Sequence, residues 1–92
     1  MTEKEEMIRG EEADRILSSN VFQESMTKVR DGIIATMAQS ALGDSETHNR
    51  LVIAMQLLNQ IEKQLKDVMN TGKMARIQVN DGFAAKVKSF VR

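Results

Sequence analysis

The chain has 92 residues, with no cysteine, no proline and a formal net charge of zero. This length fits one domain or one protomer of an assembly, and the lack of cysteine excludes disulfide bonds and thiolate metal sites. Residues 1–15 lack the apolar core of a signal peptide, and no apolar run is long enough to span a bilayer, so we expect a soluble, cytoplasmic protein.

Composition favours helices throughout. The absence of proline, with only five glycines, is typical of long helices rather than of strands joined by tight turns. We therefore predict an all-α fold and a single helical domain over residues 1–92. Charge is unevenly spread: residues 1–15 hold six acids and three bases (−3), whereas residues 51–92 hold three acids and seven bases (+4).

The first predicted helix is acidic and covers residues 1–20. Thr2 and Glu5 have the spacing of a capping box, which satisfies free N–H groups at a helix start. Ile8, Ile16 and Leu17 form only a thin apolar stripe, so we expect this helix to be ordered by a partner. The sequence SSN at residues 18–20 predicts its end.

The second predicted helix covers residues 21–41. Its apolar residues recur at intervals of three and four, which is the helical period. They are Phe22, Met26, Val29, Ile33 and Met37. Gly32 lies inside this helix and costs about 1 kcal/mol relative to alanine, which a close approach of another helix would explain.

The sequence GDSETHNR, at residues 43–50, reads as a connection between helices. Gly43 suits a left-handed residue just past a helix end, and Asp44 or Ser45 suits the N-cap of the next helix. His48, the only histidine, has no HxxxH or HExxH partner, so we interpret it as a helix-start residue. A ligand or proton-transfer role is the alternative.

The third predicted helix covers residues 46–70 and carries the strongest pattern. Its apolar residues keep an unbroken heptad spacing, the mark of an antiparallel hairpin or coiled-coil seam. They are Leu51, Ala54, Leu58, Ile61, Leu65 and Val68. Gly72 would end the helix as its C-cap. Residues 21–41 and 46–70 together predict an antiparallel helical hairpin, the core of the domain over about residues 21–70.

Residues 73–92 form a basic tail. A turn is predicted at the sequence NDG, followed by a short amphipathic helix in which Phe83, Val87 and Phe90 share one side. That stripe would pack on the hairpin or on a neighbouring chain.

Two sets of residues are candidates for interaction. Val52, Ile53 and Leu57 are apolar but lie off the heptad stripe, so this part of the helix needs cover from the terminal helices or from another copy. The second set is the basic residues of the tail, which favour a solvated or protein-docking surface over binding of nucleic acid, a phosphorylated ligand or an anionic membrane surface. They are Lys73, Arg76, Lys86, Lys88 and Arg92.

Residue types and spacings give no sign of catalysis. The five glycines are single and far apart, so no phosphate-binding loop is formed, and no set of ligands with metal-binding spacing occurs. We predict no enzyme activity, no cofactor and no metal. The prediction is a structural or adaptor protein that self-assembles or docks on a partner through its helices; the alternative is an oligomeric module that binds nucleic acid or a phosphorylated ligand.

The order of three segments resembles small all-helical proteins of tailed phages and prophages. These segments are RGEEADRILSSNVFQES, the connection GDSETHNR, and the end of the long helix at TGKMA, so the resemblance covers about residues 9–76. It implies virion assembly or an accessory role in the host cell, location in the host cytoplasm or the virion, and partners that are copies of the chain or other phage proteins. It implies no catalytic residues.

Overall fold

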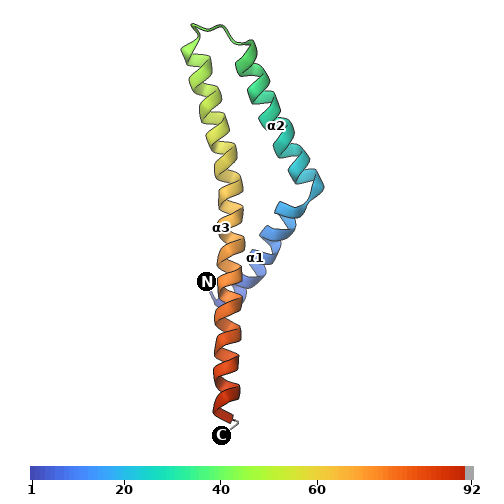
Figure 1. Cartoon of the computed structure of the whole chain (residues 1–92), viewed down its shortest axis with the longest axis vertical. Helices are drawn as coiled ribbons and strands as arrows, with labels where there is room; N and C mark the ends of the chain where they lie inside the picture. Colours follow the sequence, from blue (N-terminus) through green and yellow to red (C-terminus); the bar gives the residue numbers. More distant parts are fainter. Residues whose placement is uncertain (91–92) are drawn as a thin grey trace. The chain divides into compact units, whose positions relative to one another are not determined.

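The structure is a computed structural model that describes the backbone of residues 1–90 and the side chains of residues 1–82. Regular structure in residues 1–90 consists of three helices, α1 (Glu3–Ser18), α2 (Asn20–Gln39) and α3 (Ser45–Phe90), and this range contains no strand (Figure 1). The predicted all-α class is confirmed.

The helices belong to two compact units. Unit 1 comprises residues 1–16 and 65–92, and therefore α1 with the second part of α3. Unit 2 comprises residues 17–64, and therefore α2 with the first part of α3. The single domain over residues 1–92 stays a prediction.

Hydroxyl groups cap the first two helices. The Thr2 hydroxyl accepts a hydrogen bond from the backbone N–H of Glu5 (3.1 Å), which confirms the predicted start of α1. Ser19 separates α1 from α2 in an extended conformation, and its hydroxyl accepts from the N–H of Phe22 (3.3 Å). The predicted break near residues 18–20 is therefore made by a serine N-cap.

The end of α2 differs from the prediction at Gly43. The C-cap is Ser40, which is extended (φ −74°, ψ 148°), and Gly43 does not have a positive φ. Ser40 donates its N–H to the Met37 carbonyl (3.2 Å) and its hydroxyl to the Thr36 carbonyl (2.7 Å). Because these bonds already satisfy carbonyls of the last turn, the left-handed residue predicted at Gly43 is not needed.

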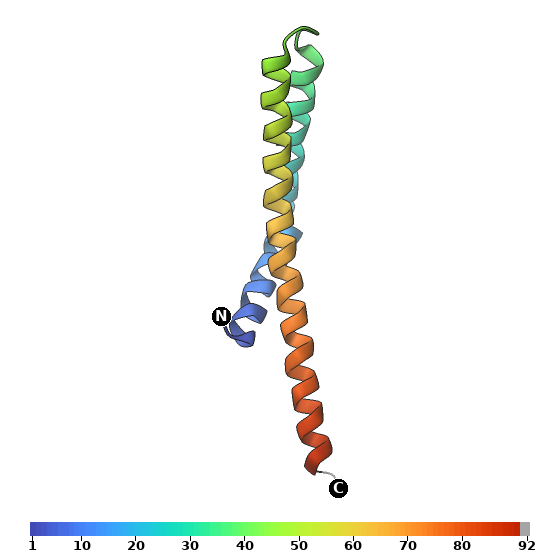
Figure 2. The ribbon, with the colours of Figure 1, turned by 90° about the vertical axis from the view of Figure 1, so that its left-hand side faces the viewer.

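The predicted end of the third helix at Gly72 is wrong. α3 continues through residue 72 to Phe90, and Figure 2 shows an unbroken ribbon from green through orange to red. Residues 83–90 thus continue α3 instead of forming a short helix after a turn at NDG. Gly72 is needed for a helix contact in unit 1 rather than for a cap, and that contact forms part of the site below. The predicted stripe of Phe83, Val87 and Phe90 lies outside the described side chains.

Burial in unit 2 agrees with part of the predicted pattern of apolar residues. Met26 of α2 and Leu58 of α3 are buried, as the spacing of apolar residues in each predicted helix indicated. Ile61, however, is 52% exposed, so its place in the seam was wrong. One turn after Leu58, the half-buried residue is Glu62 instead of Ile61. Either residue could take this place, because steps of three and of four residues both return to nearly the same side of a helix. Glu62 takes the half-buried place because its carboxylate pairs with the guanidinium of Arg30 on α2.

The core of unit 1 is made of very small residues. Gly10 and Ala13 of α1 and Gly72 and Ala75 of α3 are all buried. Such residues let two helix backbones approach more closely than leucine or methionine would allow. The thin apolar stripe predicted for α1 is therefore replaced by packing of small residues.

Candidate functional site

The predicted apolar cluster is exposed, but it does not form one surface. Val52, Ile53 and Leu57 are 46%, 54% and 61% exposed in unit 2. Ile53 and Leu57 lie one turn apart on the same side of α3, whereas Val52 points to a different side because each residue turns the helix by about 100°. Only two of the three predicted residues share a surface.

One edge of the α2–α3 pair in unit 2 is polar. The Arg30 guanidinium on α2 donates to the Asn59 side-chain oxygen (3.3 Å) and lies 2.8 Å from a carboxylate oxygen of Glu62, both on α3. The side chains of Arg30 and Glu62 are only 29% and 25% exposed. This three-residue cluster joins the two helices on that edge.

The opposite edge of the same pair is apolar. Gly32 is two residues from Arg30, and Leu57 and Ile61 are each two residues from Asn59. Two residues turn a helix by about 200°, so these positions face away from the edge where Arg30 and Asn59 meet. We call the surface formed by Val29 and Gly32 of α2 with Ile53, Leu57 and Ile61 of α3 the apolar edge; all five residues are exposed. Sequence reasoning missed Val29 and Ile61 because it placed both in the buried seam.

The apolar edge carries no ionisable group along its helical rows. The residues in register on the two helices are Ser25, Val29, Gly32 and Thr36 on α2 and Ile53, Leu57, Ile61 and Gln64 on α3. The Thr36 hydroxyl donates to the Gly32 carbonyl oxygen (2.8 Å), so its polar group has a partner within α2. Covering these rows would therefore bury no ionisable side chain of the rows themselves, and the Thr36 hydroxyl would keep its partner.

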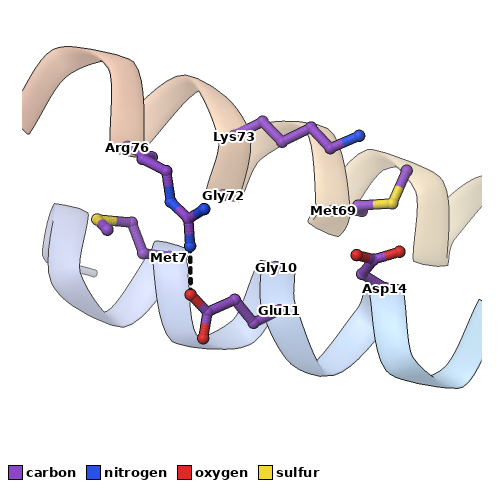
Figure 3. A pocket seen from close by; sticks show the side chains of 8 residues that line it. All are labelled: Met7, Gly10, Glu11, Asp14, Met69, Gly72, Lys73 and Arg76. Carbon is purple, nitrogen blue, oxygen red and sulfur yellow. Dashed lines mark hydrogen bonds and ion pairs between the residues drawn. The ribbon is translucent and has the colours of Figure 1, made fainter. Parts of the chain in front are cut away.

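Unit 1 contains an unusually close helix contact, shown in Figure 3. A Cβ atom added to Gly10 would lie 2.7 Å from the Cα of Gly72, and one added to Gly72 would lie 2.7 Å from the Cα of Gly10 and 2.8 Å from the Glu6 carbonyl oxygen. Any side chain at either position would therefore meet backbone, which cannot rotate away. The signal in the sequence was the pair of glycines itself, but Gly72 was predicted to be a C-cap and Gly10 was given no role.

Two of the predicted basic residues flank that contact. The Arg76 guanidinium forms an ion pair with the Glu11 carboxylate, whereas the Lys73 side chain runs along α3 with its amine directed away from Glu11 (Figure 3). The cavity that these side chains line beside the two glycines measures about 80 Å³, far below the roughly 300–1,000 Å³ of a small-molecule pocket. The acidic start and the basic end of the chain thus pair, in part, within one molecule. Lys86, Lys88 and Arg92 lie outside the described side chains.

The connection around His48 acts as a helix start. Asp44 is the N-cap of α3, and its carboxylate accepts the backbone N–H of Thr47 (3.1 Å) while its carbonyl accepts the N–H of His48 (3.2 Å). Hydrogen bonds from the side chain and the backbone of Thr47 hold the pKa of Asp44 below its ordinary value, and the nearby His48 acts in the same direction. Of the two predicted caps, Asp44 is therefore the one that the structure uses.

Metal sites and membrane-spanning helices are both absent from the described residues. Within the described residues, no three or more histidine, cysteine, aspartate or glutamate side chains are grouped to hold a metal ion. In the same part of the chain, none of the helices combines the length and apolar character needed to cross a membrane. The chain matches no protein-family model, no curated protein and no solved structure.

Proposed function

We propose that this chain is a non-enzymatic structural or adaptor protein that assembles with copies of itself through exposed helix surfaces. In this proposal, α2 and the first part of α3 form an antiparallel helical hairpin, which is the central element of the chain. The apolar edge of unit 2 is the single observation that carries the proposal.

The hairpin is supported by the contacts within unit 2. Only residues 40–44 connect α2 to α3, and a connection this short favours antiparallel neighbours. Arg30 lies about ten residues before this connection, and its partners Asn59 and Glu62 lie about fifteen residues after it. Contacts between positions at similar distances from a turn are those of two helices that run back along each other.

The balance of buried and exposed apolar groups supports assembly. In unit 2 the buried hydrophobic residues are Met26 and Leu58, whereas four large apolar residues on the apolar edge are half exposed. Burying such a side chain completely stabilises a protein by roughly 1.5–3 kcal/mol, so covering what remains exposed on four of them contributes several kcal/mol. Small helical scaffolds commonly obtain the stability that their own core lacks by oligomerisation.

The setting of this assembly is also a proposal. The resemblance of residues 9–76 to small helical proteins of tailed phages is the ground for a role in virion assembly or as an accessory protein in the host cell. In that setting the partners are further copies of the chain or other phage proteins, and the location is the host cytoplasm or the virion.

Light scattering of the purified full-length chain tests the proposal. We expect a mass above that of one chain (10.3 kDa) at high micromolar concentration, in low and in moderate salt, because the apolar edge carries no ionisable group. A strict monomer under both conditions would overturn self-assembly. Binding of DNA, RNA or nucleotides that weakens steeply with salt would instead favour the alternative role of the basic residues.

A further inference from the structure

We propose that the apolar edge of unit 2 binds the same edge of a second copy of the chain, with Leu57 of each copy seated over Gly32 of the other. This inference rests on the proposed function, because it assumes self-assembly, and it assigns the surface, the partner and the register.

Gly32 lies in open space and leaves a gap in the row of side chains on α2; we call this gap the hollow. A Cβ atom added there would meet nothing within 4 Å, so no contact inside the chain requires glycine at this position. Glycine in a helix interior is less favourable than alanine by about 1 kcal/mol, which leaves the residue unexplained within one molecule. A bulky side chain from outside, placed against the α2 backbone, would explain it.

Leu57 is at the same level of the hairpin as Gly32. The hydrogen bond between Arg30 and Asn59 fixes the register of the two helices. In an antiparallel pair, moving two residues toward the connection reaches Gly32 on α2 and Leu57 on α3, so the hollow and the leucine lie side by side on one edge.

A two-fold axis parallel to the helices then brings each leucine over a hollow. It places α3 of the second copy on α2 of the first, and the reverse, so that the contact is isologous. Ile53, Leu57 and Ile61 follow one another at one-turn intervals, and opposite them lie Thr36, Gly32 and Val29. Each large side chain on α3 thus meets a glycine, a valine or a threonine on α2, and the hydroxyl of that threonine is already hydrogen-bonded within α2. In this arrangement every helix is antiparallel to the helices next to it.

Charge and area both fit a second copy. The rows that meet contain no ionisable residue, although 28% of the chain is charged, so two copies bring no like charges together along these rows. A face about 30 Å long and two helices wide offers roughly 600 Å² from each copy, and the resulting total of about 1,200 Å² is at the lower limit of specific interfaces.

Cysteine cross-linking tests the register, because the chain has no cysteine of its own. Full-length Gly32→Cys and Leu57→Cys chains are mixed, oxidised and compared with each chain oxidised alone. We expect the mixture to give a covalent dimer that contains one chain of each kind, in at least tenfold higher yield than either chain alone, since a disulfide needs Cα atoms about 4.4–6.8 Å apart. The matched control mixes Ile34→Cys with Val52→Cys, two exposed positions directed away from the apolar edge.

The outcomes separate this inference from the proposed function. A dimer that cross-links through positions 34 and 52, or equally well through both pairs, would overturn the assigned edge while leaving self-assembly intact. A chain that stays monomeric and does not cross-link would overturn both.

A second measurement does not depend on oxidation. Gly32→Gln fills the hollow with a good helix former at a position where nothing blocks it, so helix content should be kept or raised. We expect it to weaken dimerisation at least about thirtyfold in sedimentation equilibrium, as filling the site of a central anchor does. Ile34→Gln is the control, and equal weakening by both variants would contradict the proposal.

Discussion

The two units hold their helices together in opposite ways. In unit 1, α1 meets α3 through the backbones of Gly10 and Gly72, with almost no side chain between them. In unit 2, α2 meets α3 through side chains: Met26 and Leu58 in the core, and Arg30 with Asn59 and Glu62 at one edge. The contact in unit 1 requires that residues 10 and 72 have no side chain, whereas the contact in unit 2 is made by side chains.

This difference predicts different responses to mutation. A backbone contact cannot repack, because neither glycine has a rotamer to change, so one added methyl group disturbs it. A side-chain contact loses stability in proportion to the atoms removed and to how well the space left behind collapses. Substitutions that shorten buried side chains should therefore destabilise unit 2, and substitutions that add a side chain at the two glycines should destabilise unit 1.

The largest effect is expected from Leu58→Ala in unit 2. Leu58 is buried in unit 2, so the variant should lower the free energy of unfolding by about 2–5 kcal/mol. The measurement is urea unfolding followed by circular dichroism. Val52→Ala, at an exposed position of the same helix, serves as control and should cost less than about 1 kcal/mol. Similar losses in both variants would mean that the side-chain core of unit 2 is not as described.

The next effect is expected from Gly72→Ala in unit 1. Its new Cβ would lie 2.7 Å from the Cα of Gly10, so the contact must open at a cost of about 1–3 kcal/mol, partly offset by the better helix propensity of alanine. Amide hydrogen exchange in residues 3–16 should rise, because α1 loses its packing partner.

Gly32→Ala is the matched control for that variant. The same substitution is made inside a helix, but in open space, so it should stabilise α2 by about 0.5–1 kcal/mol. Unfolding is best compared at a protein concentration low enough to keep the chain monomeric. If the two glycine variants shift stability in the same direction, the close contact of unit 1 is refuted.

A smaller effect is expected at the polar edge of unit 2. Arg30→Ala removes a partly buried ion pair between two helices and should cost about 0.5–1 kcal/mol, less at high salt. Arg50→Ala removes the exposed pair with Glu46 within one helix, which contributes about 0.3–0.5 kcal/mol. A double-mutant cycle of Arg30 with Glu62 measures the first pair directly. A coupling energy indistinguishable from zero would contradict the role of this pair in joining the two helices.

The smallest effect is a pH dependence at the start of α3. Hydrogen bonds from Thr47 lower the pKa of Asp44 in the folded chain, so its contribution to stability is present above the ordinary pKa of 3.8 and is lost as the pH falls below it. Asp44→Asn keeps an equally good cap without the titration. The thermal midpoint of the natural chain should therefore fall more than that of the variant between about pH 6 and about pH 2.5. Parallel curves would show that Asp44 does not contribute.

The fold class and most helix starts follow from patterns between residues that are close together in the chain. Helical spacing of apolar residues, the absence of proline and the hydroxyl or carboxylate at Thr2, Ser19 and Asp44 act within a few residues, so a single chain read from end to end contains them. The buried positions of Met26 and Leu58 followed from the same spacing.

The choice of buried residue after Leu58 and the role of Gly72 depend on contacts between residues that are far apart in the chain. Whether Ile61 or Glu62 takes the half-buried place after Leu58 depends on Arg30, which lies 32 positions earlier in the chain and supplies the opposite charge. Whether Gly72 ends a helix or continues it depends on Gly10, because glycine permits both a left-handed turn and a close backbone contact. Local spacing predicts which side of a helix is apolar, but the identity of the residue that faces it from another helix is set by folding of the whole chain.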